Sequence, residues 1–67
     1  MIEILLNGQA RLVEPGLTLE RLLASLNLPE GRVAVERNTR VVPRARFALE
    51  PVEQGDRFEL VTLVGGG

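Results

Sequence analysis

The 67-residue chain contains no cysteine, no histidine and no lysine, and each absence excludes a class of chemistry. Without Cys and His, disulfides and the usual zinc sites are excluded, so a hydrophobic core has to hold the fold. Without Lys, Schiff-base and lysine-nucleophile chemistry is excluded. Tyr is absent too, and no His is present to activate the few hydroxyl side chains. We therefore expect no catalytic residues, no metal and no bound cofactor, and we predict that the chain is not an enzyme by itself.

The chain also lacks a large excess of charge of one sign. Eight basic and nine acidic residues leave a net charge of −1, whereas a nucleic-acid-binding domain of this size normally shows a basic excess. Arg40, Arg44 and Arg46 form the only local basic concentration, which we interpret as a solvated surface. The opening MIEILLNGQ has neither the basic start nor the apolar length of a signal peptide or membrane span. The charge and the opening segment therefore lead us to expect no nucleic-acid and no membrane partner. The absence of Cys fits a reducing compartment, so we also expect a cytoplasmic location.

The first half of the sequence predicts a hairpin followed by a helix. Ile2, Ile4 and Leu6 alternate with other residues as on one face of a strand, and Asn7-Gly8 is typical of a type I′ turn. A second strand should follow over residues 10–14, although adjacent Leu12 and Val13 leave its facing open. The next apolar stripe has helical spacing, with an N-cap before it and a helix end at residues 27–29. The residues concerned are Leu19, Leu22, Leu23 and Leu26, with Thr18 as the cap.

The second half predicts further strands around one irregular segment. Val33 and Val35 share a strand face, a short extended piece stops at Pro43, and Phe47 should anchor the irregular segment to the core. The last strand, within residues 56–64, can add parallel beside the first in the sheet centre. The expected fold is α+β, a mixed sheet of four to five strands with one helix packed across it.

The last strand leads directly into three glycines and has apolar residues on both faces. Phe58 and Leu60 are the better core candidates, so Val61 and Leu63 should be exposed as a partner-docking patch. Gly65, Gly66 and Gly67 could enter a channel too narrow for other residues and present the Gly67 α-carboxylate there. That carboxylate is ionised at neutral pH and needs activation, for example as an acyl-adenylate made with ATP. A sulfur nucleophile could then form a thiocarboxylate, or an amine an amide, with ATP consumed by the activating partner.

Three segments of the sequence resemble one family. They are V-A-V-x-x-N with V-V-P-R-x-x-F, then G-D-x-F-x-L-V-x-x-V-G-G-G, supported by the opening LNGQ and the helix entry PGLTLERLL. With them the chain resembles the ThiS family, the ubiquitin-like β-grasp sulfur carriers of thiamine biosynthesis. The resemblance implies a β-grasp domain over residues 1–64 and a flexible glycine tail over residues 65–67. Phe47, where Trp is also found, and the third glycine are mild departures.

The resemblance also implies partners and a mechanism. An E1-like adenylating enzyme (ThiF) would adenylate Gly67, and a cysteine desulfurase or rhodanese-type donor would supply sulfur. The thiocarboxylate would then donate sulfur to thiazole synthase (ThiG). Three alternatives stay open: a related carrier for molybdopterin or tRNA thiolation, a ubiquitin-like protein modifier, and an interaction module with an inert tail.

Overall fold

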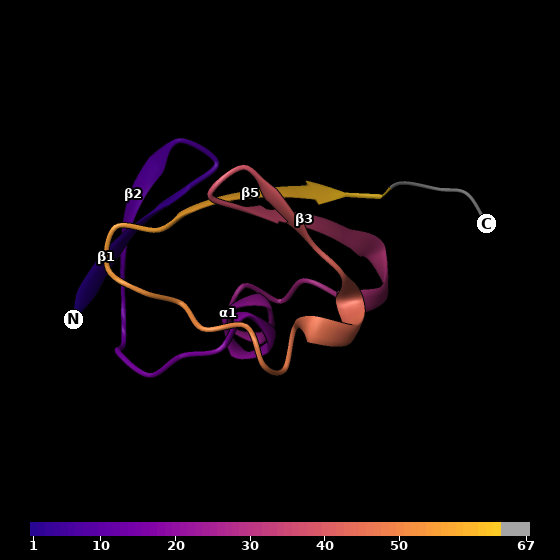
Figure 1. Cartoon of the computed structure of the whole chain (residues 1–67), viewed down its shortest axis with the longest axis horizontal. Coiled ribbons are helices and arrows are strands. Elements are labelled where there is room, and N and C mark those ends of the chain that lie inside the picture. Colours follow the sequence, from indigo (N-terminus) through magenta and orange to yellow (C-terminus); the bar gives the residue numbers. More distant parts are fainter. Residues whose placement is uncertain (64–67) are drawn as a thin grey trace.

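The computed structural model describes residues 1–63, apart from the side chain of Glu30. In this part of the chain, five strands form one mixed sheet and the helix α1 lies across one of its faces (Figure 1). The predicted α+β arrangement is confirmed. The elements are β1 (Ile2–Leu6), β2 (Gln9–Val13), α1 (Leu19–Ser25), the 3-10 turn η1 (Glu30–Arg32), β3 (Val33–Arg37), β4 (Arg40–Val42), the 3-10 turn η2 (Arg44–Arg46) and β5 (Arg57–Thr62).

The sheet has the strand order β2-β1-β5-β3-β4, which places the last strand in the centre. β5 runs parallel to β1, with Leu5 opposite Arg57 and Leu6 opposite Phe58. It runs antiparallel to β3 on its other side, over five residue pairs. The prediction that the last strand adds parallel beside the first is therefore confirmed. β5 ends at Thr62, with the described chain continuing to Leu63.

The hairpin and the helix form for the local reasons that the sequence indicates. Asn7 and Gly8 both have positive φ, 50° and 82°, as a two-residue type I′ turn requires. The Thr18 hydroxyl accepts a hydrogen bond from the Arg21 backbone N–H at 3.3 Å, so Thr18 is the N-cap. The helix ends at Ser25, and Leu26, the last leucine of the stripe, follows it as a partly buried cap residue.

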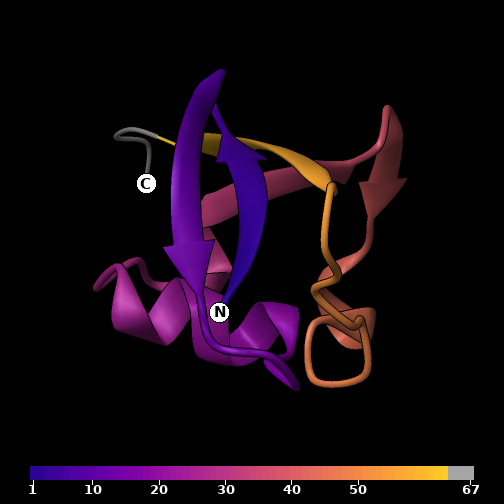
Figure 2. The same cartoon turned by 90° about the vertical axis from the view of Figure 1, so that its left-hand side faces the viewer.

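The core lies between the sheet and α1, which both views of the ribbon place against the same sheet face (Figures 1 and 2). Phe58 of β5 meets the helix leucines there, and Phe47 anchors the segment after η2, as predicted. Val13 is buried and Leu12 is 63% exposed, which settles the facing of β2. The buried apolar residues are Ile4, Val13, Leu19, Leu22, Leu23, Val33, Val35, Val42, Phe47, Val52 and Phe58.

Candidate docking face beside the C-terminal segment

The face of the sheet that α1 leaves uncovered carries the predicted docking residues. Side chains alternate along β5, so Phe58 points into the core while Glu59 and Val61 point outwards. Val61 is 59% exposed and Leu63 is 55% exposed. Their exposure is as predicted, and their role in docking stays a prediction. A hydrophobic pair on an uncovered sheet face is a reasonable contact for a partner protein.

Neighbouring backbone holds this pair in strand geometry. Val61 lies opposite Ala34 of β3, and the small Ala34 side chain leaves Val61 open to a partner. Leu63 lies beyond the last β5 residue, yet its backbone N–H donates to the Arg32 carbonyl at 2.7 Å. The chain is thus extended up to Leu63. Gly65, Gly66 and Gly67, the predicted glycine tail, lie outside the described residues.

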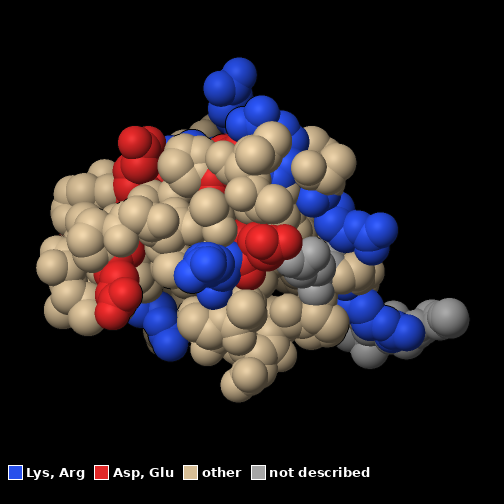
Figure 3. Space-filling view, turned by 90° about the horizontal axis from the view of Figure 1, so that it is seen from below, with Lys and Arg blue, Asp and Glu red and all other residues tan. Residues whose placement is uncertain are grey.

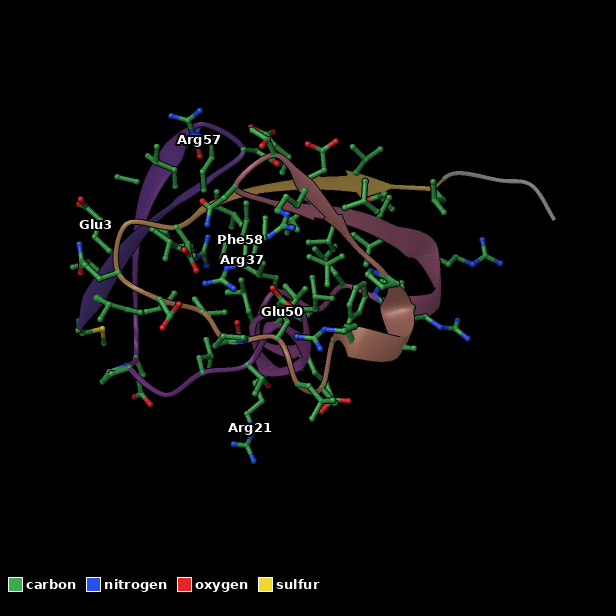
Figure 4. All side chains as sticks on the ribbon, in the orientation of Figure 1. Glu3, Arg21, Arg37, Glu50, Arg57 and Phe58 are labelled. Atoms are coloured by element: carbon green, nitrogen blue, oxygen red, sulfur yellow. The ribbon has the colours of Figure 1, made fainter. Side chains whose placement is uncertain are left out.

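At the other end of β5, one arginine gathers three carboxylates. Arg37, the last residue of β3, donates to Asp56 at 2.8 Å, to Glu50 at 3.0 Å and to Glu53 at 2.7 Å. Figure 4 shows Arg37 and Glu50 next to each other. The Arg37 bonds hold the pKa of Glu50 below its usual value, against the opposing effect of burial. Glu50 is therefore ionised at neutral pH and committed to an ion pair, which makes it a poor general acid.

The same network joins two of the segments that carry the family resemblance. Asn38 ends the V-A-V-x-x-N segment, and its side-chain Nδ2 donates to Asp56 Oδ1 at 3.0 Å. Asp56 belongs to the G-D-x-F segment, so one hydrogen bond joins residues 18 positions apart. Asn38 has φ of 52°, a conformation that Asn tolerates better than most residues. Arg37 was not among the predicted site residues, and its only signal in the sequence is its position directly before Asn38.

The basic concentration predicted around η2 is exposed. Figure 3 shows a run of basic side chains along one side of the molecule. Arg40, Arg44 and Arg46 are all exposed, and Arg40 and Arg46 help to line an open cavity of about 450 Å³. Arg46 pairs with Glu50, which also lines this cavity, at 3.2 Å. The lining holds no Ser, Thr, Cys, Lys or His side chain. The exposure of all three arginines fits the interpretation of a solvated surface.

Within residues 1–63, no cluster of three or more acidic, His or Cys side chains is arranged to hold a metal ion. In the same range, no helix has the length and apolar character needed to cross a membrane. Within the described residues, the two features at the ends of β5 are therefore an exposed apolar pair, Val61 and Leu63, and the ionic network of Arg37.

Comparison with known proteins gives matches along almost the entire chain. The sulfur carrier protein ThiS of Escherichia coli is 33% identical over 66 residues, which cover 98% of this chain and 100% of that protein. Thiazole synthases of Paramagnetospirillum magneticum and Magnetococcus marinus are 38% and 41% identical over 66 residues. The chain spans only 20% of the length of either thiazole synthase.

A solved structure and a family model agree with these relatives. The crystal structure of the thiamine biosynthesis protein ThiS from Geobacter metallireducens superposes with a TM-score of 0.83 at 30% identity, covering 98% of this chain and all of that one. The fold is thus the β-grasp fold of ThiS, with five strands in a mixed sheet and one helix. The model of the ThiS family matches residues 4–67, which includes the three glycines. The chain belongs to the ThiS family.

Proposed function

We propose that this chain is a sulfur carrier in thiamine biosynthesis, and that its sulfur is carried as a thiocarboxylate on Gly67. The observation that carries the proposal is the family match, which runs through the described domain and on to the last glycine. The E. coli relative of similar length is named a sulfur carrier protein. The side-chain inventory supports the same reading, because the sequence offers no His, Cys, Lys or Tyr for chemistry of its own.

The proposed chemistry converts the terminal carboxylate to a thiocarboxylate in three steps. First, a Gly67 carboxylate oxygen attacks the α-phosphate of ATP, and pyrophosphate leaves. Second, the terminal sulfur of a donor persulfide attacks the activated carbon, and AMP leaves. A second thiol of the donor then forms a disulfide with the persulfide cysteine and releases the thiocarboxylate. All catalytic groups belong to the partners, so the chain acts as their substrate.

The proposal requires three kinds of partner. An E1-like adenylating enzyme would activate Gly67, and a cysteine desulfurase or rhodanese-type protein would supply the persulfide. Thiazole synthase would receive the sulfur. Support for that last partner comes from the two bacterial thiazole synthases, since each contains a stretch similar to this whole domain.

Docking through β5 would help a glycine tail to bind. Ordering three glycines costs about 3–6 kcal/mol of backbone entropy. Val61 and Leu63 are a little more than half exposed, so covering them completely returns roughly 2–3 kcal/mol. The pair would therefore offset about half of the ordering cost, and the remaining affinity has to come from other contacts around the tail.

Intact-mass spectrometry tests the proposal. The purified protein is first shown by its mass to end at Gly67, and it is then incubated with ATP, the adenylating enzyme and a persulfide donor. The expected product is heavier by the difference between one sulfur and one oxygen atom. A variant without Gly67 should gain nothing. An unchanged mass in the intact protein would contradict the carrier function, and transfer to an amine would indicate a protein modifier instead.

A further inference from the structure

The side chain of Asn7 takes the place of a strand backbone beside β5. Its Oδ1 accepts a hydrogen bond from the Leu60 N–H at 2.7 Å, and its Nδ2 donates to the Leu60 carbonyl at 3.2 Å. One carboxamide therefore satisfies both backbone groups of a residue 53 positions away. The Asn7 backbone N–H donates to the Phe58 carbonyl at 2.9 Å, so the side chain continues the ladder that β1 begins.

The hairpin explains why a side chain, and not a strand backbone, pairs with β5 at this point. β1 pairs with β5 only as far as Leu6 opposite Phe58, because the type I′ turn then carries the chain away. Asn7 opens that turn with φ of 50°. Without its carboxamide, the N–H and carbonyl of Leu60 would face the edge where β1 has ended. Backbone groups of a strand that lack partners favour fraying of that strand.

The Asn7 bonds lie directly before the docking pair. On its β3 side, β5 is supported as far as Leu63 by the Arg32 carbonyl. On the β1 side, the last hydrogen bonds to β5 within residues 1–63 are those of Asn7 with Leu60. Val61 and Leu63 follow at once, so the direction in which they project depends on how firmly Leu60 is held on both sides.

We propose that Asn7 is a positioning residue for partner recognition. Its carboxamide keeps the end of β5 in strand geometry, and Val61 and Leu63 are thereby presented as a preformed surface to the adenylating enzyme. A preformed surface binds more tightly because less conformational entropy is lost on binding. This inference rests on the proposed carrier function and assigns a positioning role to a residue whose carboxamide bonds to the backbone of β5.

The chain offers a matched control in Asn38. Asn38 is also in a turn, with φ of 52°, and its Oδ1 accepts from the Arg57 N–H at 2.9 Å. It therefore holds the opposite end of the same strand. Both asparagines can be replaced by glycine without strain at positive φ. Asn7→Gly and Asn38→Gly each remove an amide that is bonded to β5, but only the first lies beside the docking pair.

Two measurements test the role of Asn7. Hydrogen exchange of the free protein should be faster at the Leu60 amide in Asn7→Gly, with the exchange of Val35 in the core unchanged. In ATP–pyrophosphate exchange with the adenylating enzyme, Asn7→Gly should raise KM for the carrier about tenfold, equivalent to about 1.4 kcal/mol, with little change in kcat. Asn38→Gly should leave KM within about twofold while lowering the melting temperature.

The outcomes separate the inference from the proposed function. Faster exchange at Leu60 with an unchanged KM in Asn7→Gly would overturn the positioning role alone. An equal rise of KM in Asn38→Gly would overturn it as well, because general destabilisation would then explain both variants. No pyrophosphate exchange with the wild-type protein would instead overturn the proposed function. Should Asn7→Gly fail to fold, Asn7→Asp keeps the acceptor for Leu60 N–H, loses the donor to its carbonyl, and should also raise KM.

Discussion

Arg37 and Asp56 join the end of β3 to the start of β5 through a hydrogen bond of 2.8 Å between Nε and Oδ2. Their side chains are only 17% and 8% exposed. Asp56 is also held by the side chain of Asn38 at 3.0 Å and by the backbone N–H of Glu53 at 2.8 Å. In residues 1–63, no buried side-chain polar atom is left without a partner. These bonds fix the start of the central strand, and removal of Arg37 would leave the buried Asp56 carboxylate without its cationic partner.

Arg37→Met should consequently destabilise the domain strongly. Loss of one partner from a largely buried ion pair typically costs about 3–5 kcal/mol, and a small domain has little more stability than that. We expect a decrease in the free energy of unfolding of about 3 kcal/mol by urea denaturation at pH 7. Arg11→Met, at an exposed position on β2, is the control and should stay within about 0.5 kcal/mol of the wild type. Equal effects in the two variants would show that the network adds nothing to stability.

Acid should weaken the same network. Burial by itself raises the pKa of Asp56, but the hydrogen bonds from Arg37, Asn38 and the Glu53 N–H together outweigh it and hold that pKa below its usual value. The pKa of Glu50 is lowered by Arg37 as well. Because both folded values lie below the unfolded values of about 3.9 and 4.3, their contribution is complete above about pH 5. It is lost as the pH falls through the folded values.

Urea denaturation between pH 2 and pH 7 measures this loss. The free energy of unfolding of the wild type should be level above about pH 5 and should fall below about pH 4. In Arg37→Met the carboxylates lose their main partner, so the curve should be flatter over the acid range. A variant curve parallel to that of the wild type would assign the pH dependence to other carboxylates.

The elements of this fold could be predicted because they depend on local patterns. Leucines at helical spacing gave α1, and Asn7-Gly8 gave the hairpin. The length of the turn also determines which side chains of β2 face the core, a point that the adjacent Leu12 and Val13 left open. A two-residue loop fixes Leu6 opposite Gln9, and counting back along the register places Val13 opposite Ile2 on the core face.

The ionic network and the Asn7 contact could not be predicted in the same way. Arg37 meets carboxylates 13, 16 and 19 positions away, and the irregular segment between β4 and β5 decides which of nine acidic residues it reaches. Asn7 reaches Leu60 across 53 positions, through the register between β1 and β5. These contacts are consequences of the assembled sheet. Local sequence carries only a hint of them, such as an Asn at a turn position.

Removal of the helix cap should have a small, defined effect. The Thr18 hydroxyl satisfies the Arg21 N–H at the start of α1, and the helix has only seven residues. Thr18→Ala should lower the free energy of unfolding by about 1 kcal/mol, as for other N-caps. Thr18→Ser keeps the acceptor and should restore most of that loss. Thermal denaturation of both variants checks this, and equal melting temperatures would show that the hydroxyl does not act as a cap.

Leu63→Glu should separate partner binding from folding. Leu63 is 55% exposed beside β5, so a carboxylate there meets water and should change the free energy of unfolding by less than about 1 kcal/mol. In a complex the same carboxylate would lie desolvated against an apolar surface, so affinity for the adenylating enzyme should fall at least tenfold. Val61→Glu, on the outward face of β5, should likewise weaken binding while changing the free energy of unfolding little. Calorimetric titration measures the affinity, and circular dichroism confirms the fold.

Leu49→Glu supplies the control for that experiment. Leu49 is 70% exposed and follows η2, away from the docking pair, so the substitution changes charge and exposed apolar area in the same way. Its affinity for the enzyme should match that of the wild type. If Leu49→Glu weakens binding as much as Leu63→Glu does, net charge rather than the β5 surface governs recognition. If Leu63→Glu retains full affinity, the partner approaches the glycine tail without touching this face of the sheet.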